Sequence, residues 1–237
     1  MFGFLDPVLL VAQSLLTGLA DALAIALGEN ATAGAILLTT LAVRVLLLPL
    51  TVRSLRARAA QASIAPTERM LRQQFARDPG RLRREIADLR ARNGVSQWAA
   101  IVPMLAQSPV ILLLYRLFSA PTIGGHANLL YTHALFGLPL GSRFAAAVAS
   151  GYLPIYLGLF LVIGLAAWWS SSSAKRSVPQ DVPDPRVAAI SSTIARVLPF
   201  GALVVTAFVP LAVGIYLAVT SWWTATERHF GARMQAG

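Results

Sequence analysis

The residue best placed to do chemistry in this sequence is Arg44, a cation inside a long apolar run. The run from Ala33 to Val52 is 20 residues long, about the length that a helix needs to cross the hydrocarbon core of a bilayer. At about 1.5 Å per residue, Arg44 would lie about 12 Å from the end of the span. A guanidinium that faced lipid there would cost at least about 2.5–3.5 kcal/mol. The sequence therefore predicts a water-accessible recess around Arg44, lined by Thr40 one turn earlier on the same helix face.

A purely structural role for Arg44 is the alternative. Its side chain could snorkel to the lipid headgroups or pair with an internal acid. Asp21 is the only Asp or Glu within the other predicted spans. Because charged residues inside membranes usually serve a function, we favour the functional interpretation.

The composition indicates a polytopic membrane protein. Of 237 residues, 56% are hydrophobic and 13% are charged, which is too apolar for a soluble domain. The chain is long enough for about five or six spans. It contains no cysteine, so disulfides, thiol catalysis and thiolate metal sites are excluded. It also lacks the Gly-x-x-x-x-Gly-Lys-[Ser/Thr] motif that cradles phosphates, and we expect no nucleotide, cofactor or metal.

Two other functional classes stay open. An intramembrane hydrolase would need a nucleophile beside a base, but His126, His133 and His229 stand at no catalytic or metal-ligand spacing. We therefore predict no catalytic residue and no enzyme. A small secondary transporter would also place a charge near the bilayer midplane, with Arg44 as its substrate site. It should show an internal repeat and acidic coupling residues, and neither is visible.

The apolar runs and the polar breaks between them predict an all-α architecture with five spans between residues 31 and 223. Residues 7–27 could lie on the membrane surface as an amphipathic helix or cross it, and the sequence leaves both open. Residues 1–43 contain no Lys or Arg, so we expect no secretory signal of the usual kind. The predicted order is an amphipathic helix (1–30), span 1 (31–52), a basic helical hairpin (53–97), span 2 (98–119), an outer loop (120–143), span 3 (144–169), a cytoplasmic loop (170–186), spans 4 and 5 (187–223) and a basic tail (224–237).

The hairpin carries most of the charge. Between Arg53 and Arg92 there are eleven Arg and four acidic residues. Asp78 is a typical N-cap and Pro79 a typical first helical residue, so they mark the start of the second helix. Such charge runs are commonly solvated loops, and we also expect this surface to contact anionic lipids, ribosomal RNA or nascent chains, but not DNA. The predicted recruiting residues are Arg72, Arg77, Arg81, Arg83 and Arg84.

The distribution of basic residues predicts the orientation. With 53–97, 170–186 and 224–237 in the cytoplasm, 16 of the 20 basic residues lie inside and only Arg143 lies outside. Trp168 and Trp169, at the end of span 3, are typical of an interfacial anchor. The hairpin and the carboxyl terminus are therefore predicted to be cytoplasmic.

Several short motifs occur in a characteristic order. They are Leu38-Thr39-Thr40-Leu41-Ala42-Val43-Arg44 followed by Leu48-Pro49-Leu50; Asp78-Pro79 at the tip of the hairpin; Asn93-Gly94-Val95 leading to Pro103, Gln107 and Pro109; Leu114-Tyr115; Pro154 with Gly158; Pro199; and Pro210 with Tyr216. Over about residues 5–230 the chain resembles the YidC-type membrane protein insertases, which are related to the mitochondrial Oxa and chloroplast Albino insertases.

The resemblance implies a five-span bundle in the bacterial inner (plasma) membrane. Its groove would be open to the cytoplasm and lipid and closed on the outside, where 7–27 would form an amphipathic helix. Arg44 would be the positive centre of the groove, lined by Thr40, Gln107 and Tyr216. The implied partners are nascent membrane-protein clients, anionic lipids, the Sec translocon and the ribosome. Phe160 and Leu165 replace polar residues of the family pattern, so we expect a less polar groove.

Overall fold

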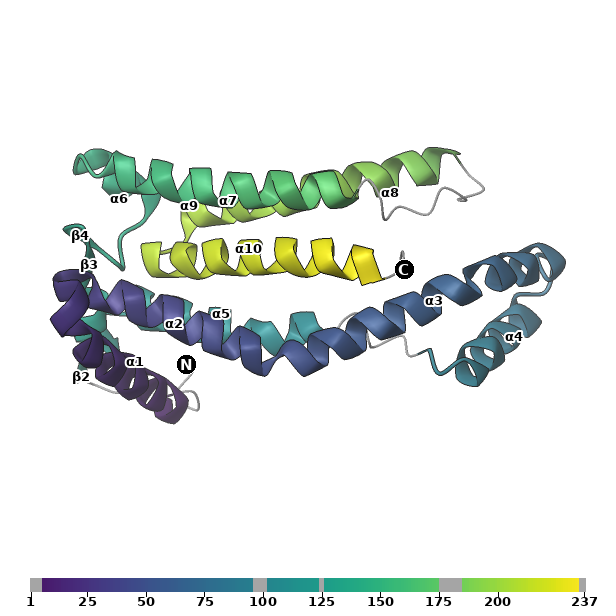
Figure 1. The fold of residues 1–237 in the computed structure, drawn as a ribbon, viewed down its shortest axis with the longest axis horizontal. Coiled ribbons are helices and arrows are strands. Elements are labelled where there is room, and N and C mark those ends of the chain that lie inside the picture. Colours follow the sequence, from purple (N-terminus) through teal and green to yellow (C-terminus); the bar gives the residue numbers. More distant parts are fainter. Residues whose placement is uncertain (1–5, 96–101, 124–125, 175–184, 235–237) are drawn as a thin grey trace. The chain divides into compact units, whose positions relative to one another are not determined.

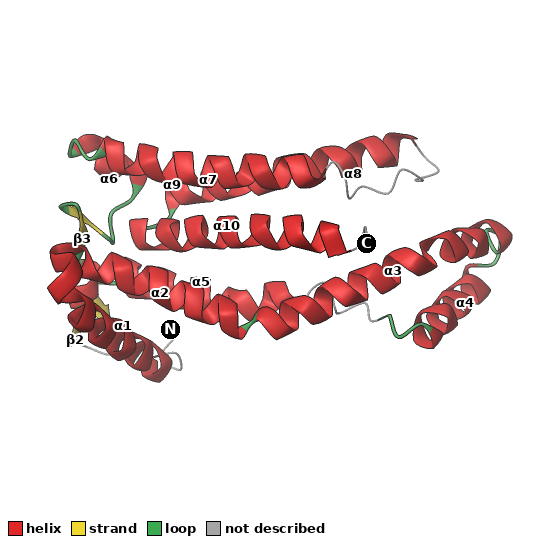
Figure 2. Ribbon diagram, viewed as in Figure 1, coloured by secondary structure: helices red, strands yellow, loops and turns green. Residues whose placement is uncertain are grey.

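The computed structural model describes residues 6–95, 102–123, 126–174 and 185–234, and these are mostly helical (Figures 1 and 2). They fall into two compact units: residues 1–44 with 110–237, here called the bundle unit, and residues 45–109, the hairpin unit. Two helical stretches, Pro7–Leu46 and Leu153–Ser172, are long and apolar enough to cross a membrane, and Pro109–Ser119 and Ser192–Phe208 are shorter apolar helices. The predicted helical class is confirmed, and the number of spans stays a prediction.

The described part of the bundle unit consists mainly of helices. Two of them, α2 and α5, continue into the hairpin unit. The helices are α1 (Asp6–Leu27), α2 (Ala31–Leu46), α5 (Val102–Ser119), α6 (Phe144–Ala149), α7 (Leu153–Ala174), α8 (Pro185–Val197), α9 (Gly201–Phe208) and α10 (Leu211–Met234), with 3₁₀ turns η2 (Gly28–Asn30), η4 (Leu129–Tyr131) and η5 (Leu198–Phe200).

The chain turns back on itself between α1 and α2 (Figure 1). Gly28, with φ of +54°, begins the turn η2 in a backbone conformation that favours glycine. A Cβ at Gly34 would lie 2.5 Å from Leu27 Cδ1, so the absence of a side chain lets α2 pass close to the end of α1. One stripe of α1, including Leu9 and Leu16, is buried against the rest of the unit. Residues 7–27 are thus a helix distinct in direction from α2.

Helices α7 and α10 pack along each other and form the main pair of the bundle unit. Gly214 permits this approach, because a Cβ there would lie 2.7 Å from Leu159 Cδ2. The Trp222 indole donates a hydrogen bond to the Val162 carbonyl at 3.0 Å. Phe160, a departure from the family pattern, packs its ring 5.9 Å from that of buried Tyr156. The polar residue missing at this position is therefore replaced by an aromatic contact in the core.

The loop of residues 120–143 ties several helices together at one end of the bundle unit. Its two short antiparallel pairs are β1 (Thr122–Ile123) with β2 (His126–Ala127) and β3 (Ala134–Leu135) with β4 (Leu138–Pro139). Its hydrogen bonds reach α2 (Thr32 Oγ1 to His133 Nδ1, 2.5 Å), α5 (Asn128 Nδ2 to the Leu117 carbonyl) and α10 (Ala212 N to Leu140 O, 3.0 Å). The loop therefore fixes the spacing of three helices.

The hairpin unit contains α3 (Leu48–Gln74) and α4 (Pro79–Arg92). The helix breaks at Leu47 because Pro49 has no N–H to donate to the Val45 carbonyl. Asp78 Oδ1 accepts a hydrogen bond of 2.9 Å from the Arg81 backbone N–H, and Pro79 opens the helix. The N-cap predicted from the sequence is present.

Candidate functional site

Arg44 is buried in the last turn of α2, with 5% of its surface exposed. Thr40, one turn earlier, is also buried, and its hydroxyl donates to the Ile36 carbonyl at 2.6 Å. The lone pairs of the Thr40 hydroxyl therefore remain available to accept from a donor such as a guanidinium. A buried cation on an apolar helix is costly unless polar or charged groups surround it.

Helix α10 supplies two such groups. Tyr216 is buried, and it interacts electrostatically with Arg44, as does Glu227. Arg44, Thr40 and Tyr216, three of the predicted site residues, thus lie in the same unit, and their role as a site stays a prediction. Gln107 belongs to α5, but its side chain lies outside the described part of the structure.

Glu227 is not among the predicted site residues. It lies eleven residues after Tyr216, about three helical turns, and so on the same face of α10. The predicted last span ends at Trp223 and leaves Glu227 in the tail, whereas α10 continues to Met234. The Trp223 indole donates to Glu227 Oε1 at 2.5 Å. The eleven-residue spacing is the signal in the sequence that could have placed this carboxylate on the face of α10 that carries Tyr216.

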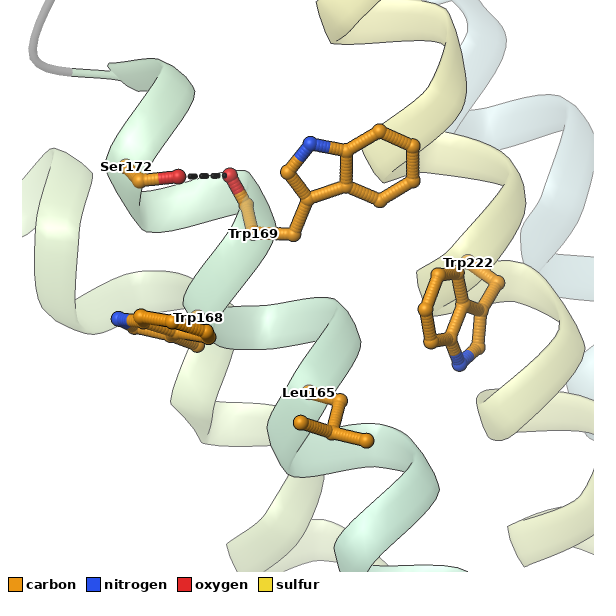
Figure 3. Close-up of a pocket in the computed structure, with 5 residues that line it drawn as sticks. All are labelled: Leu165, Trp168, Trp169, Ser172 and Trp222. Atoms are coloured by element: carbon orange, nitrogen blue, oxygen red, sulfur yellow. Dashed lines mark hydrogen bonds between the residues drawn. The ribbon is translucent and has the colours of Figure 1, made fainter.

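An aromatic pocket lies between α7 and α10 (Figure 3). It has a volume of about 490 Å³ and is lined by Leu165, Trp168, Trp169, Ser172 and Trp222. The rings of Trp169 and Trp222 are 5.7 Å apart, and the Ser172 hydroxyl donates to the Trp169 carbonyl at 2.8 Å. Leu165, the second departure from the family pattern, thus contributes to an apolar wall. Exposed tryptophans such as Trp168 suit the boundary between hydrocarbon and water.

A second charged cluster joins the two helices of the hairpin unit. Glu68 Oε1 on α3 accepts hydrogen bonds from Arg72, at 2.8 Å, and from Arg90 on α4, at 2.9 Å. The side chain of Glu68 is 11% exposed and that of Arg90 is 20% exposed. Burial raises the pKa of Glu68, but the hydrogen bond from Arg72 and the charge of Arg90 together outweigh it, so the pKa lies below its usual value of 4.5.

The five predicted recruiting arginines differ in their surroundings. Arg77, Arg83 and Arg84 are exposed. Arg72 binds Glu68, and the Arg81 guanidinium lies 4.9 Å from the centre of the Phe75 ring. The first three therefore offer their charge to solvent, whereas Arg72 and Arg81 also help to hold the hairpin together.

We expect the contact between α3 and α4 to weaken as the pH falls below about 4.5. Because the pKa of Glu68 is lowered by folding, its contribution is complete above the unfolded pKa and is lost as the pH falls through the folded pKa. The natural sequence has no cysteine, so spin labels at Gln73→Cys and Ala87→Cys would report the distance between helices. The distance distribution should broaden between pH 7 and pH 3. Equal broadening in a Glu68→Gln background would contradict the assignment to Glu68.

Comparison with known proteins places the chain in a family. A family model described as "60Kd inner membrane protein" matches residues 25–236. The chain belongs to this family. Curated relatives named "Membrane protein insertase YidC" come from Mycolicibacterium paratuberculosis (24% identical over 213 residues, 76% of this chain and 60% of the relative) and Mycobacterium leprae (24% over 213 residues, 76% and 56%). Another, from Oceanobacillus iheyensis, is 29% identical over 151 residues, covering 62% of this chain and 55% of the relative.

The short sequence motifs indicated a resemblance to the YidC-type insertases, and these matches confirm it. The chain spans 60% or less of the length of these three relatives. Together with the apolar helices, membership of the 60Kd inner membrane protein family indicates a bacterial inner-membrane protein. The curated relatives are all named as membrane protein insertases.

Proposed function

We propose that this chain is a membrane protein insertase, which moves transmembrane segments of client proteins into the bilayer and helps them to fold. Membership of the 60Kd inner membrane protein family supports the proposal, as do the relatives named as insertases. The single observation that carries it is the buried Arg44 at the end of an apolar helix, in the electrostatic field of Tyr216 and Glu227. A buried charge within a membrane-spanning helix is costly and usually serves a function, so we assign one to Arg44.

In the proposed mechanism Arg44 is the centre of a hydrophilic groove that is open to the cytoplasm and lipid. Thr40, Gln107 and Tyr216 line it. A short polar segment of the client enters the groove, where Arg44 attracts its carboxylates and carbonyl oxygens. The apolar stretch of the client then passes into lipid, and its transfer out of water supplies the free energy. The protein lowers the barrier and consumes no nucleotide.

The proposed topology has five spans, with the hairpin unit and the carboxyl terminus in the cytoplasm. The exposed Arg77, Arg83 and Arg84 would then meet anionic lipid headgroups, the ribosome or nascent clients as these approach the membrane. A contact with the Sec translocon belongs to the same proposal. The aromatic pocket, with its tryptophans, would lie near the cytoplasmic boundary of the bilayer.

Reconstitution tests the proposal directly. The full chain is placed in vesicles, and a single-span client with an acidic outer tail is synthesised in their presence without added energy source for transport. We expect the protease-protected fraction of the client to rise severalfold above that in protein-free vesicles. A folded chain that takes up a small solute but leaves insertion at the background level would favour the transporter instead. Comparison of the membrane proteome before and after depletion would then identify the clients.

A further inference from the structure

A second pocket, here called the lateral pocket, lies on a different part of the bundle unit from Arg44. Its volume is about 500 Å³, and its walls come from α2, the β3–β4 turn, α7 and α10. Leu37, Phe136, Gly158 and Ile215 represent these four walls, and every lining residue is apolar. A Cβ at Gly158 would meet nothing within 4 Å, so this glycine leaves space beside the α7 wall.

The chemistry of the walls excludes water as a stable occupant. A buried water needs about two to four hydrogen-bond partners, and apolar side chains offer none. The α7 wall belongs to the stretch Leu153–Ser172, which is long and apolar enough to cross a membrane. Leu37 on the α2 wall is 40% exposed. The pocket is therefore accessible at membrane depth and suited to hydrocarbon.

The size of the lateral pocket distinguishes between hydrocarbon occupants. A helix with a diameter of 10–12 Å and a rise of 1.5 Å fills about 140 Å³ per residue, so a pocket of this volume holds only about one turn. A client helix or a helix from a second copy of the chain would therefore leave nearly all of its length outside. A single acyl chain is thin and flexible enough to enter.

The backbone next to a cationic residue is bonded to one wall of the lateral pocket. Leu211, in the α10 wall, donates its backbone N–H to the Ser142 carbonyl at 2.8 Å. The next residue is the exposed Arg143, the only Lys or Arg between Arg116 and Lys175. A phosphate is the anion that a guanidinium binds well at a membrane surface. An apolar pocket with a wall bonded to the residue before an exposed arginine matches the two parts of a phospholipid.

We propose that the lateral pocket binds one acyl chain of a membrane phospholipid, with the lipid phosphate beside Arg143. This site goes beyond the proposed insertase function and does not depend on it. Lipid retention and client insertion are measured in separate experiments. Loss of lipid binding would count against this site only, and loss of insertion would count against the proposed function only.

Native mass spectrometry tests the proposal. The full chain is released by a mild detergent from vesicles that contain phosphatidylglycerol, and its mass shows the lipid that stays bound. We expect one lipid to remain bound per chain. Gly158→Phe should fill the pocket and reduce retention at least fivefold, whereas Gly164→Phe should not. Gly164 is the matched control, because it lies on the same helix, has nothing within 4 Å of an added Cβ and is not part of the pocket. Arg143→Gln should reduce retention about threefold.

A photoreactive acyl chain locates the lipid. Phosphatidylglycerol with a diazirine in its tail should label Leu37 and Ile215 more than Leu161 and Val204, which are exposed outside the pocket. Equal labelling would mean ordinary surrounding lipid, and cross-links between protein copies would mean a different occupant; either result would overturn the proposal. Should Gly158→Phe fail to fold by its melting temperature, Ile215→Phe fills the same space from α10. Unchanged retention in a folded variant of either kind also refutes it.

Discussion

Replacing Arg44 by Ala is expected to reduce the initial rate of insertion of a client with an acidic outer tail by about ten- to a hundredfold. The guanidinium is the group that would bind the carboxylates of the client as they leave water. A hydrogen bond to a charged group contributes about 1.5–3 kcal/mol, and each 1.4 kcal/mol corresponds to about a factor of ten. Protease protection of the client in reconstituted vesicles measures the change.

The control must account for Glu227, which interacts electrostatically with Arg44 and would lose that cation in the variant. Arg44→Ala with Glu227→Gln removes both charges, so a folded double variant isolates the attraction for the client. Arg44→Lys keeps the charge and should retain most of the rate. A client with an uncharged tail should lose less than the acidic one. Undiminished insertion of the acidic client by the Arg44→Ala variant would refute the role given to this residue.

Replacing Glu68 by Ala is expected to release α4 from α3 at neutral pH. Both Arg72 and Arg90 would lose the carboxylate to which they donate. Arg90 is the more affected, since its side chain is mostly buried and its Nε has no hydrogen-bond partner among the described residues. A lost charged hydrogen bond at such a position costs about 1.5–3 kcal/mol. Hydrogen exchange of the α4 amides should accelerate accordingly, by at least about tenfold.

Arg72→Ala is the matched control for this second experiment. The Arg72 side chain is 60% exposed, and an exposed ion pair contributes about 0–1 kcal/mol. Exchange of the α4 amides should therefore change little, although Glu68 loses one of its two partners. Equal acceleration in both variants would show that α4 is held by its apolar contacts and not by the bond between Glu68 and Arg90.

Much of the helical framework is visible in the sequence because the signals are local. The length of the apolar run around Arg44 and its single cation point to an intramembrane charge, and Asp78 followed by Pro79 predicts the start of α4. The order of short motifs also identifies the family, since each motif depends only on neighbouring residues. None of these predictions requires knowledge of which helices meet.

Features that depend on helix pairing could not be predicted in the same way. Glu68 and Arg90 are 22 residues apart, and only the register of the hairpin brings them together. Glu227 follows Trp222 and Trp223, which read as the end of a span, although no Gly or Pro stops the helix before it. The lateral pocket exists because Leu37, Gly158 and Ile215 come from three different helices. These three residues are far apart in the sequence, so no local pattern predicts that they meet.

The loop of residues 120–143 has a mechanical consequence. Its hydrogen bonds hold α2, α5 and α10 together at one end of the bundle unit. A helix that tilts about one end is displaced most at its opposite end. Over the 24 residues of α10, about 36 Å, a tilt of about 5° would displace Met234 by about 3 Å while Leu211 stayed nearly still. A tilt of α10 about its first residues would therefore move Glu227, near the other end, far more than Leu211.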